Sequence, residues 1–98
     1  MSDILDKNEI KENLDSLDGW IIKNNLLYKK FSFKTFMNAF SFMNIIADQS
    51  EKVDHHPKLI NEYNKVEVEL FTHSSNSISN KDFSLARFID NTYEEIFS

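Results

Sequence analysis

The sequence predicts an α+β fold: a two-layer domain whose four-stranded antiparallel sheet carries three helices on one face, in the order α-β-β-α-β-β-α. Residues 66–70 alternate Val66, Val68 and Leu70 with two glutamates, which is typical of a strand with one buried and one wet face. Two other apolar segments flank an Asn–Asn pair, which indicates a hairpin. The remaining segments have helical periodicity, and strands joined by hairpins form an antiparallel sheet that helices can cover.

The first helix is expected over residues 7–17. Asp6 is a suitable N-cap, Glu9 three residues later completes a capping box, and Gly19 suits the left-handed residue that follows a helix. The apolar residues Ile10, Leu14 and Leu17 fall on one face of this helix.

The next segment predicts a β-hairpin. Trp20–Lys23 is the first strand, Asn24–Asn25 tolerate the positive φ angles of a tight turn, and Leu26–Phe33 is the returning strand. Period-two alternation places Leu27, Phe31 and Phe33 on the core side of the returning strand, with Lys29 as the exception.

A second helix is expected from Thr35 to about Gln49, where a broad apolar stripe recurs with helical spacing. We interpret the stripe as core, and its width also allows contact with a second subunit. Pro57 cannot lie inside a helix, so Ser50–His56 is expected to leave the helix. The stripe consists of Phe36, Ala39, Phe40, Met43, Ile46 and Ala47, with Phe42 and Ile45 beside it.

The second half of the sheet follows. A third strand is expected to include Leu59 and Ile60, and a polar turn around Glu62–Asn64 leads into the strand at residues 66–70.

A last helix is expected over residues 80–96, after a polar loop at Ser74–Ser77. Ser79 and Asp82 fit a capping box at its start. Its apolar face consists of Leu85, Ala86, Ile89, Tyr93 and Ile96.

Length and composition limit the function classes. The 98 residues are expected to form a single domain over residues 1–98. The 11 basic and 16 acidic residues give a net charge of -5, which disfavours direct binding to nucleic acid or to anionic membranes. The absence of cysteine excludes a disulfide framework and a thiolate metal site.

No apolar run approaches the ~20 residues of a membrane span, and the N-terminus is too polar for a secretory signal, so a cytoplasmic protein is expected.

The three histidines are the main candidates for chemistry. His55 and His56 precede Pro57, which stiffens the backbone, and His73 follows a strand. Histidine exchanges protons near neutral pH, so the group suggests general acid–base catalysis. Adjacent residues of an extended chain point in opposite directions, so the pair can share one pocket only if the backbone turns there. The alternative is that both are surface side chains in a loop, which is the commoner explanation of such a pair taken alone.

A metal site is a second alternative. His55, His56 and His73, with Asp82 or Asp54, would supply nitrogen and oxygen ligands. Adjacent ligands are awkward for one tetrahedral ion, and no HExxH spacing is present. Metal binding therefore ranks below acid–base chemistry, and no metal is expected.

Three polar residues near the histidines have structural as well as functional explanations. Glu51 is an exposed carboxylate at a helix end, Thr72 ends a strand, and Asp82 is an acid in the first turn of a helix.

Short motifs occur in a specific order along most of the chain. They are Gly19–Trp20, Phe31–Met43, Glu51–Pro57 (EKVDHHP), Asn61–Val66 (NEYNKV), Thr72–His73 and Ser79–Asp82. Together, over about residues 19–90, they resemble the pterin-4a-carbinolamine dehydratase family. The helix-backed, four-stranded antiparallel sheet of that family agrees with the element order above. Leu59 stands where many members have Trp, and Ser77 stands where a Gly is usual.

The resemblance implies that the protein removes water from a 4a-hydroxytetrahydropterin to give the quinonoid dihydropterin, in the recycling of tetrahydrobiopterin. This reaction needs one proton delivered to the departing hydroxyl and one removed from a ring nitrogen, which histidines can do without a metal or an organic cofactor. By position, His55, His56 and His73 match the family's catalytic histidines, and Glu51 and Asp82 are supporting acids. The pterin site would be lined by Asp54, His55, His56, Phe71, Thr72, His73 and Ser74.

A non-catalytic role is the alternative function. Animal members of the family also act as dimerisation cofactors for a homeodomain transcription factor, and the family fold is a self-associating scaffold, typically a tetramer built from dimers. The resemblance therefore implies a homo-oligomer, either a dimer or a homotetramer, and allows a further protein partner on a helix surface. This alternative does not require the three histidines to converge.

Overall fold

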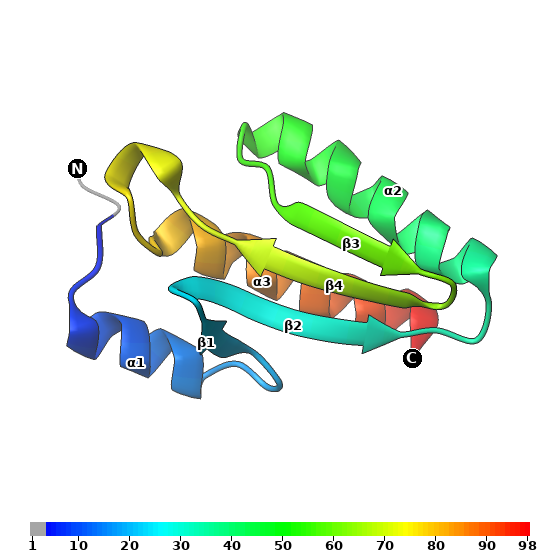
Figure 1. Cartoon of the computed structure of the whole chain (residues 1–98), viewed down its shortest axis with the longest axis horizontal. Helices are drawn as coiled ribbons and strands as arrows, with labels where there is room; N and C mark the ends of the chain where they lie inside the picture. The colour runs from blue at the N-terminus through cyan, green and yellow to red at the C-terminus, as the bar shows by residue number, and fades with distance from the viewer. Residues whose placement is uncertain (1–3) are drawn as a thin grey trace.

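The computed structural model describes residues 4–98 and forms two layers (Figure 1). Within these residues, three α-helices and four β-strands follow the order α-β-β-α-β-β-α, so the predicted α+β fold class is confirmed. The elements are α1 (Lys7–Asp15), β1 (Ile21–Lys23), β2 (Leu26–Ser32), α2 (Phe36–Val53), β3 (Lys58–Glu62), β4 (Lys65–Leu70) and α3 (Asn80–Thr92), with a 3-10 turn at His73–Ser75 and a π-helical turn at Tyr93–Phe97.

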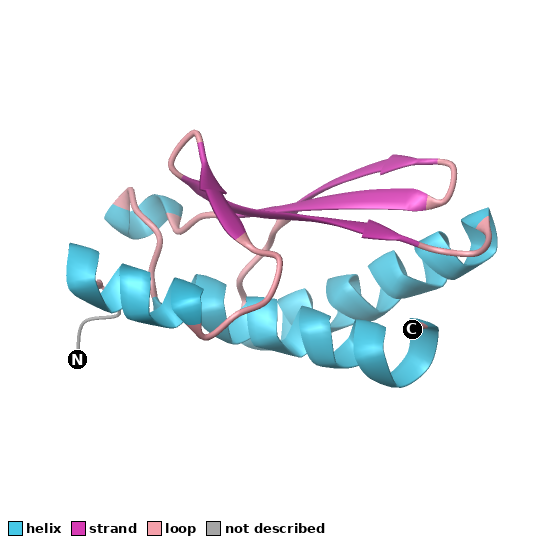
Figure 2. Ribbon diagram, turned by 90° about the horizontal axis from the view of Figure 1, so that it is seen from below, coloured by secondary structure: helices cyan, strands magenta, loops and turns pink. Residues whose placement is uncertain are grey.

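The four strands form one antiparallel sheet in the order β1-β2-β4-β3. The turn between β1 and β2 is made by Asn24 and Asn25, whose φ angles are 53° and 63°, as the Asn pair predicts. Figure 2 shows the helices on one side of the sheet and the other face open. None of the helices in residues 4–98 is long and apolar enough to cross a membrane.

The core lies between the sheet and the helices. Leu27 and Phe31 of β2 and Val66, Val68 and Leu70 of β4 are buried, as their period-two spacing predicts. Phe42 of α2 lies at the centre of an aromatic cluster. Its ring centroid is 4.9 to 6.1 Å from those of Phe31, Phe33, Tyr93 and Phe97.

α2 differs from the prediction in its length. The expectation that Ser50–His56 lies outside the helix is wrong for residues 50–53, because α2 continues to Val53. Pro57 restricts only its own φ angle and the backbone of His56, so it does not require the helix to end earlier.

The buried face of α2 is also narrower than predicted. Only part of the apolar stripe is core, because α2 lies on the sheet along a single line of residues one turn apart. The buried residues of α2 are Ala39, Phe42, Ile46 and Ser50. Phe36, Phe40 and Ala47, which were expected in the core, are exposed.

The last helix is α-helical only as far as Thr92 and then ends in a π-helical turn, whereas the sequence predicts a helix to residue 96. The Ser98 N–H donates to the Tyr93 carbonyl (2.9 Å), which closes the π-helical turn. This turn brings Phe97 against Phe33, with ring centroids 5.4 Å apart. Ile96, which was expected on the apolar face, is instead 60% exposed.

Lys29, the exception on the core side of β2, carries its charge to the edge of the core. Its Nζ lies 2.9 Å from Oδ1 of Asp90 and donates to the carbonyl of Asp18 (2.7 Å). Asp90 also accepts the indole N–H of Trp20 (2.9 Å). A lysine therefore fits on this face because its apolar stem packs while its ammonium group is paired.

Tyr28 lies on the open face of the sheet and has an altered pKa. Its hydroxyl donates to Oε1 of Glu67 (2.5 Å). This bond, followed by burial and by the charges of Glu67 and Glu69, raises the pKa of Tyr28 to about 12. The fold therefore favours the neutral phenol. The resulting stabilisation is fully present below about pH 10, the ordinary pKa of tyrosine, and is lost as the pH rises through about 12.

Replacing Glu67 by glutamine is therefore expected to lower the pKa of Tyr28 towards about 10. Tyrosinate absorbance during an alkaline titration measures this pKa. Comparison with Tyr28→Phe shows which part of the absorbance change belongs to Tyr28. Glu69→Gln is the matched control and should shift the titration less, because Glu69 makes the smallest of these contributions. An unchanged titration in Glu67→Gln would contradict the role of the hydrogen bond.

Candidate active site

The C-terminal end of α2 determines where the histidine pair begins. Asp54 has the left-handed conformation (φ 51°, ψ 47°), and the His55 N–H donates to the Ser50 carbonyl (3.0 Å) in a Schellman closure. Aspartate is one of the few non-glycine residues that adopt this conformation readily. The chain therefore turns here: the His55 side chain reaches α3, whereas that of His56 turns back to α2.

His55 is paired with a buried carboxylate. Its Nε2 lies 2.6 Å from Oδ1 of Asp82, which is 27 residues away in the chain. The His55 side chain is 11% exposed and that of Asp82 is 0% exposed. The structure therefore brings these two predicted residues together at the junction of α2 with the first turn of α3.

The second oxygen of Asp82 makes the contacts that cap α3. Oδ2 accepts the Ser79 N–H (2.9 Å) and the Thr72 hydroxyl (2.7 Å). The predicted capping box of Ser79 and Asp82 is thus confirmed. Asp82 caps α3 with one oxygen and contacts His55 with the other, so its structural and functional explanations are compatible.

His56 forms a separate pair at the surface. Its Nε2 lies 2.5 Å from Oε2 of Glu51, in the last turns of α2. The side chains are 54% and 77% exposed, so water competes for both partners. Glu51 thus restrains His56 less firmly than Asp82 restrains His55.

His73 begins the 3-10 turn after β4 and is exposed, as is Ser74. The Phe71 ring contacts the His73 ring, with centroids 5.1 Å apart. Thr72 is buried and bonds to Asp82, so His73 is one residue from the network around His55.

The histidines do not form a metal site in this structure. No hydrogen bond joins one histidine to another in residues 4–98. Over the same range, no three His, Cys, Asp or Glu side chains are grouped so that they could hold a metal ion. The residues that could supply ligands in the metal-site alternative, which are His55, His56 and His73 with Asp82 or Asp54, therefore do not form such a group in the part of the chain that the structure describes.

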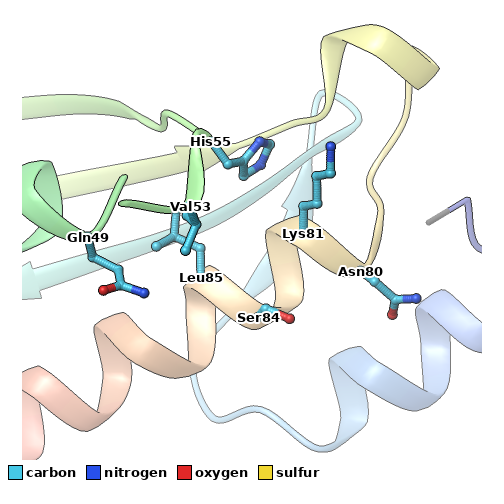
Figure 3. A pocket seen from close by; sticks show the side chains of 7 residues that line it. All are labelled: Gln49, Val53, His55, Asn80, Lys81, Ser84 and Leu85. Atoms are coloured by element: carbon cyan, nitrogen blue, oxygen red, sulfur yellow. The ribbon is translucent and has the colours of Figure 1, made fainter. Parts of the chain in front are cut away.

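A cavity of about 180 Å³ lies beside His55, between the end of α2 and the start of α3 (Figure 3). In Figure 3, the His55 ring and the Lys81 side chain lie next to each other above the first turn of α3. The lining residues are Gln49, Val53, His55, Asn80, Lys81, Ser84 and Leu85.

Most residues that line this cavity were missed by the sequence analysis. Of the lining set, only His55 was a predicted site residue. Residue type does not distinguish Gln49, Lys81 or Ser84 from other polar surface residues. Gln49 and Val53 lie one turn apart on α2, and Lys81, Ser84 and Leu85 lie on one face of α3. This spacing indicates a shared site only when α2 and α3 are known to be neighbours.

Comparison with known proteins identifies the family. The sequence model of the family described as Pterin 4 alpha carbinolamine dehydratase matches residues 3–92. The chain belongs to this family. Relatives named for the same dehydratase in Sulfolobus acidocaldarius and Prochlorococcus marinus are 44% and 41% identical over 86 and 90 residues. The first alignment covers 88% of this chain and 94% of the relative, and the second covers 92% and 95%.

One solved structure agrees with membership of this family, and a second shares the fold. The crystal structure of a transcriptional coactivator/pterin dehydratase from Brucella melitensis has a TM-score of 0.86 and 40% identity, and the match covers 89% of this chain and 95% of that chain. A pterin dehydratase-like protein that is a RuBisCO assembly factor in the alpha-carboxysome has a TM-score of 0.61 and 20% identity, with coverages of 74% and 83%. At that identity the likeness concerns the fold alone.

The two departures from the family pattern lie outside the cavity. Leu59 is partly buried and packs against the core from β3, and Ser77 forms an isolated bridge with Thr72. Neither residue lines the cavity beside His55.

Proposed function

We propose that this protein catalyses the dehydration of 4a-hydroxytetrahydropterin to quinonoid dihydropterin, in the recycling of tetrahydrobiopterin, with histidines as general acid and base. Family membership supports the reaction class. The observation that carries the proposal is the position of His55, which borders a cavity and is supported by a fully buried carboxylate. A proton-transfer group on a rigid support beside open space is what acid–base catalysis requires.

The proposed reaction breaks the bond between C4a and its hydroxyl oxygen. One proton is delivered to the departing hydroxyl, which leaves as water, and a second proton is removed from a ring nitrogen. No atom is oxidised or reduced overall, so no redox partner is needed. His55, His56 and His73 are the proposed acids and bases, and each well-placed group contributes roughly 10²–10⁴-fold.

The residues around the cavity suit a pterin. The carboxamides of Gln49 and Asn80 can both donate and accept, as the pyrimidine edge of a pterin requires, and Val53 and Leu85 provide apolar contact for its rings. The volume of about 180 Å³ is below the roughly 300–1,000 Å³ of a complete small-molecule pocket. We therefore expect the pterin to extend beyond it.

The remaining predicted residues have proposed places around this pterin. Asp54, Phe71, His73 and Ser74 are the residues we expect beside the part of the ligand that extends from the cavity. Thr72 is 4% exposed and its hydroxyl bonds to Asp82, so it would contribute through Asp82. A cytoplasmic location fits this role in cofactor recycling.

A protein-binding role is the second proposed function. Near its start α2 exposes Phe36, Met37 and Phe40, whose exposed fractions are 42%, 68% and 47%. An exposed apolar patch of this kind is typical of protein–protein contact, and would serve self-association as a dimer or homotetramer or a separate partner. The Brucella melitensis protein is described as a transcriptional coactivator as well as a dehydratase. Both functions can coexist, because the patch and His55 lie at opposite ends of α2.

Dehydration of freshly generated 4a-hydroxytetrahydropterin, followed by absorbance, tests the proposed function. We expect the wild-type protein to raise the rate above the spontaneous rate in buffer. Asn44→Ala, which changes an exposed α2 residue outside the cavity, is expected to keep that rate. A rate with the wild-type protein that equals the spontaneous rate in buffer would contradict the dehydratase proposal. The protein-binding role would then be the leading function.

A further inference from the structure

Asp82 is surrounded by donors that determine how it presents its two oxygens. It is fully buried, and a carboxylate can only accept hydrogen bonds. Oδ2 receives the Ser79 N–H and the Thr72 hydroxyl, while Oδ1 faces Nε2 of His55. Because a backbone N–H can only donate, the Ser79 N–H requires an acceptor at the Oδ2 position.

The two hydroxyl groups beside Asp82 have one consistent orientation. Thr72 directs its single hydroxyl hydrogen at Oδ2 of Asp82, so Ser79 must be the donor in the 2.7 Å contact between the Thr72 and Ser79 hydroxyls. The Ser79 hydroxyl oxygen in turn accepts the Lys81 N–H (3.2 Å). Among the described hydrogen bonds, the contact to Oδ1 of Asp82 is therefore left to His55.

We propose that this network fixes His55 as the tautomer that carries hydrogen on Nε2, so that Nδ1 is the atom that exchanges a proton with the substrate, and that Thr72 is a positioning residue acting through Asp82. The catalytic meaning of this inference rests on the proposed function. While Nε2–H donates to Asp82, the imidazole can gain or lose a proton only at Nδ1. His56 has no comparable constraint, because its partner Glu51 is 77% exposed.

Asp82→Asn gives a sharp test because an amide, unlike a carboxylate, has two different ends. The Ser79 N–H can only donate and therefore requires an oxygen at the Oδ2 position, where the Thr72 hydroxyl also donates in the wild-type protein. The NH₂ group must then face His55, and Nε2 must accept from it. The substitution is therefore expected to reverse the tautomer, moving the hydrogen to Nδ1, rather than only to weaken the contact.

Long-range proton–nitrogen NMR correlations show which ring nitrogen carries the hydrogen, without any turnover. For neutral His55 in the wild-type protein, we expect the Nε2–H tautomer in roughly tenfold excess or more, because the other tautomer loses a hydrogen bond to a charged group. Asp82→Asn should reverse this ratio. Thr72→Val, which removes the hydroxyl but keeps the shape of the side chain, should reduce the excess, whereas Thr72→Ser, which keeps the hydroxyl, should preserve it.

Hydrogen mainly on Nδ1 in the wild-type protein would overturn the inference, and so would an unchanged tautomer in folded Asp82→Asn. The wild-type measurement alone is decisive if the variants do not fold. An Nε2–H tautomer in a protein that does not catalyse dehydration supports the assignment of the tautomer, and overturns the proposed function together with the catalytic role of Nδ1 that rests on it. In an active enzyme, Asp82→Asn should lower kcat with little change in KM, because the tautomer affects proton transfer rather than substrate binding.

Discussion

Replacing His55 by alanine is expected to lower the rate of 4a-hydroxytetrahydropterin dehydration by roughly 10²–10⁴-fold, the usual contribution of a positioned acid or base. In the part of the chain from residue 4 to residue 98, His55 is the histidine that both borders the cavity and contacts a buried carboxylate. The absorbance assay measures the loss after the spontaneous rate has been subtracted. Circular dichroism should show that the variant is folded.

His55→Gln is the matched variant for this prediction. Its amide N–H can still donate to Asp82, so the buried carboxylate keeps a partner, but an amide does not exchange protons near neutral pH. This variant should be stable and about as inactive as His55→Ala. His56→Ala is expected to cause a smaller loss, because His56 is exposed and its partner Glu51 holds it weakly. Wild-type activity in folded His55→Gln would contradict the proposed role of His55.

Replacing Phe42 by alanine is expected to reduce the free energy of unfolding by about 3–5 kcal/mol. The Phe42 side chain is fully buried, and its ring lies among four other aromatic rings. These rings come from β2, from the residue that follows it and from the C-terminal π-helical turn, so they cannot easily move together to fill the space that is left. Whole domains are stable by only about 5–15 kcal/mol. Urea unfolding should therefore show a large decrease in the midpoint.

Asn44→Ala is the control on the same helix, because Asn44 is exposed and a surface substitution usually changes stability by less than about 0.5 kcal/mol. Phe40 is 47% exposed and belongs to the patch proposed for self-association. A much larger loss in Phe40→Ala, dependent on protein concentration, would indicate that the exposed side of α2 is buried against another chain. A Phe42→Ala loss below the ~1 kcal/mol of an average substitution would be inconsistent with the aromatic cluster described above.

The fold could be predicted because short-range signals agree with the burial pattern. Val66, Val68 and Leu70 alternate with glutamates, and all three are buried on the core side of β4. The Asn24–Asn25 turn has the positive φ angles that the hairpin requires. Each of these features depends on a few neighbouring residues, so no knowledge of distant contacts is needed.

The ends of two helices depend on interactions that the local pattern does not contain. α2 continues past Gln49 because Ser50 can be buried with its hydroxyl bonded to the Ile46 carbonyl (2.7 Å), and because Asp54 accepts the left-handed conformation that ends the helix. A polar serine gives no sign in the sequence that it will lie in the core. The π-helical turn that buries Phe97 in place of Ile96 likewise depends on packing against Phe33.

The sequence motifs name candidate site residues but not their arrangement. They select His55, His56, His73 and Asp82, whereas most of the residues that line the cavity carry no signal in the sequence. Which histidine meets Asp82 depends on the left-handed Asp54 and on the docking of α3 beside α2, which are long-range consequences of folding. The convergence of His56 and His73 on the same substrate as His55 stays a prediction.

The contact between His55 and Asp82 also bears on when a newly made chain becomes active. Ribosomes synthesise proteins from the N-terminus at roughly 5–20 residues per second. His55 and His56 are synthesised before Thr72, which supplies the hydroxyl of the network, and before α3, which supplies the carboxylate of Asp82. A nascent or C-terminally shortened chain would therefore carry His55 without its support. Activity is expected to begin only after the last helix has been synthesised and has docked against α2.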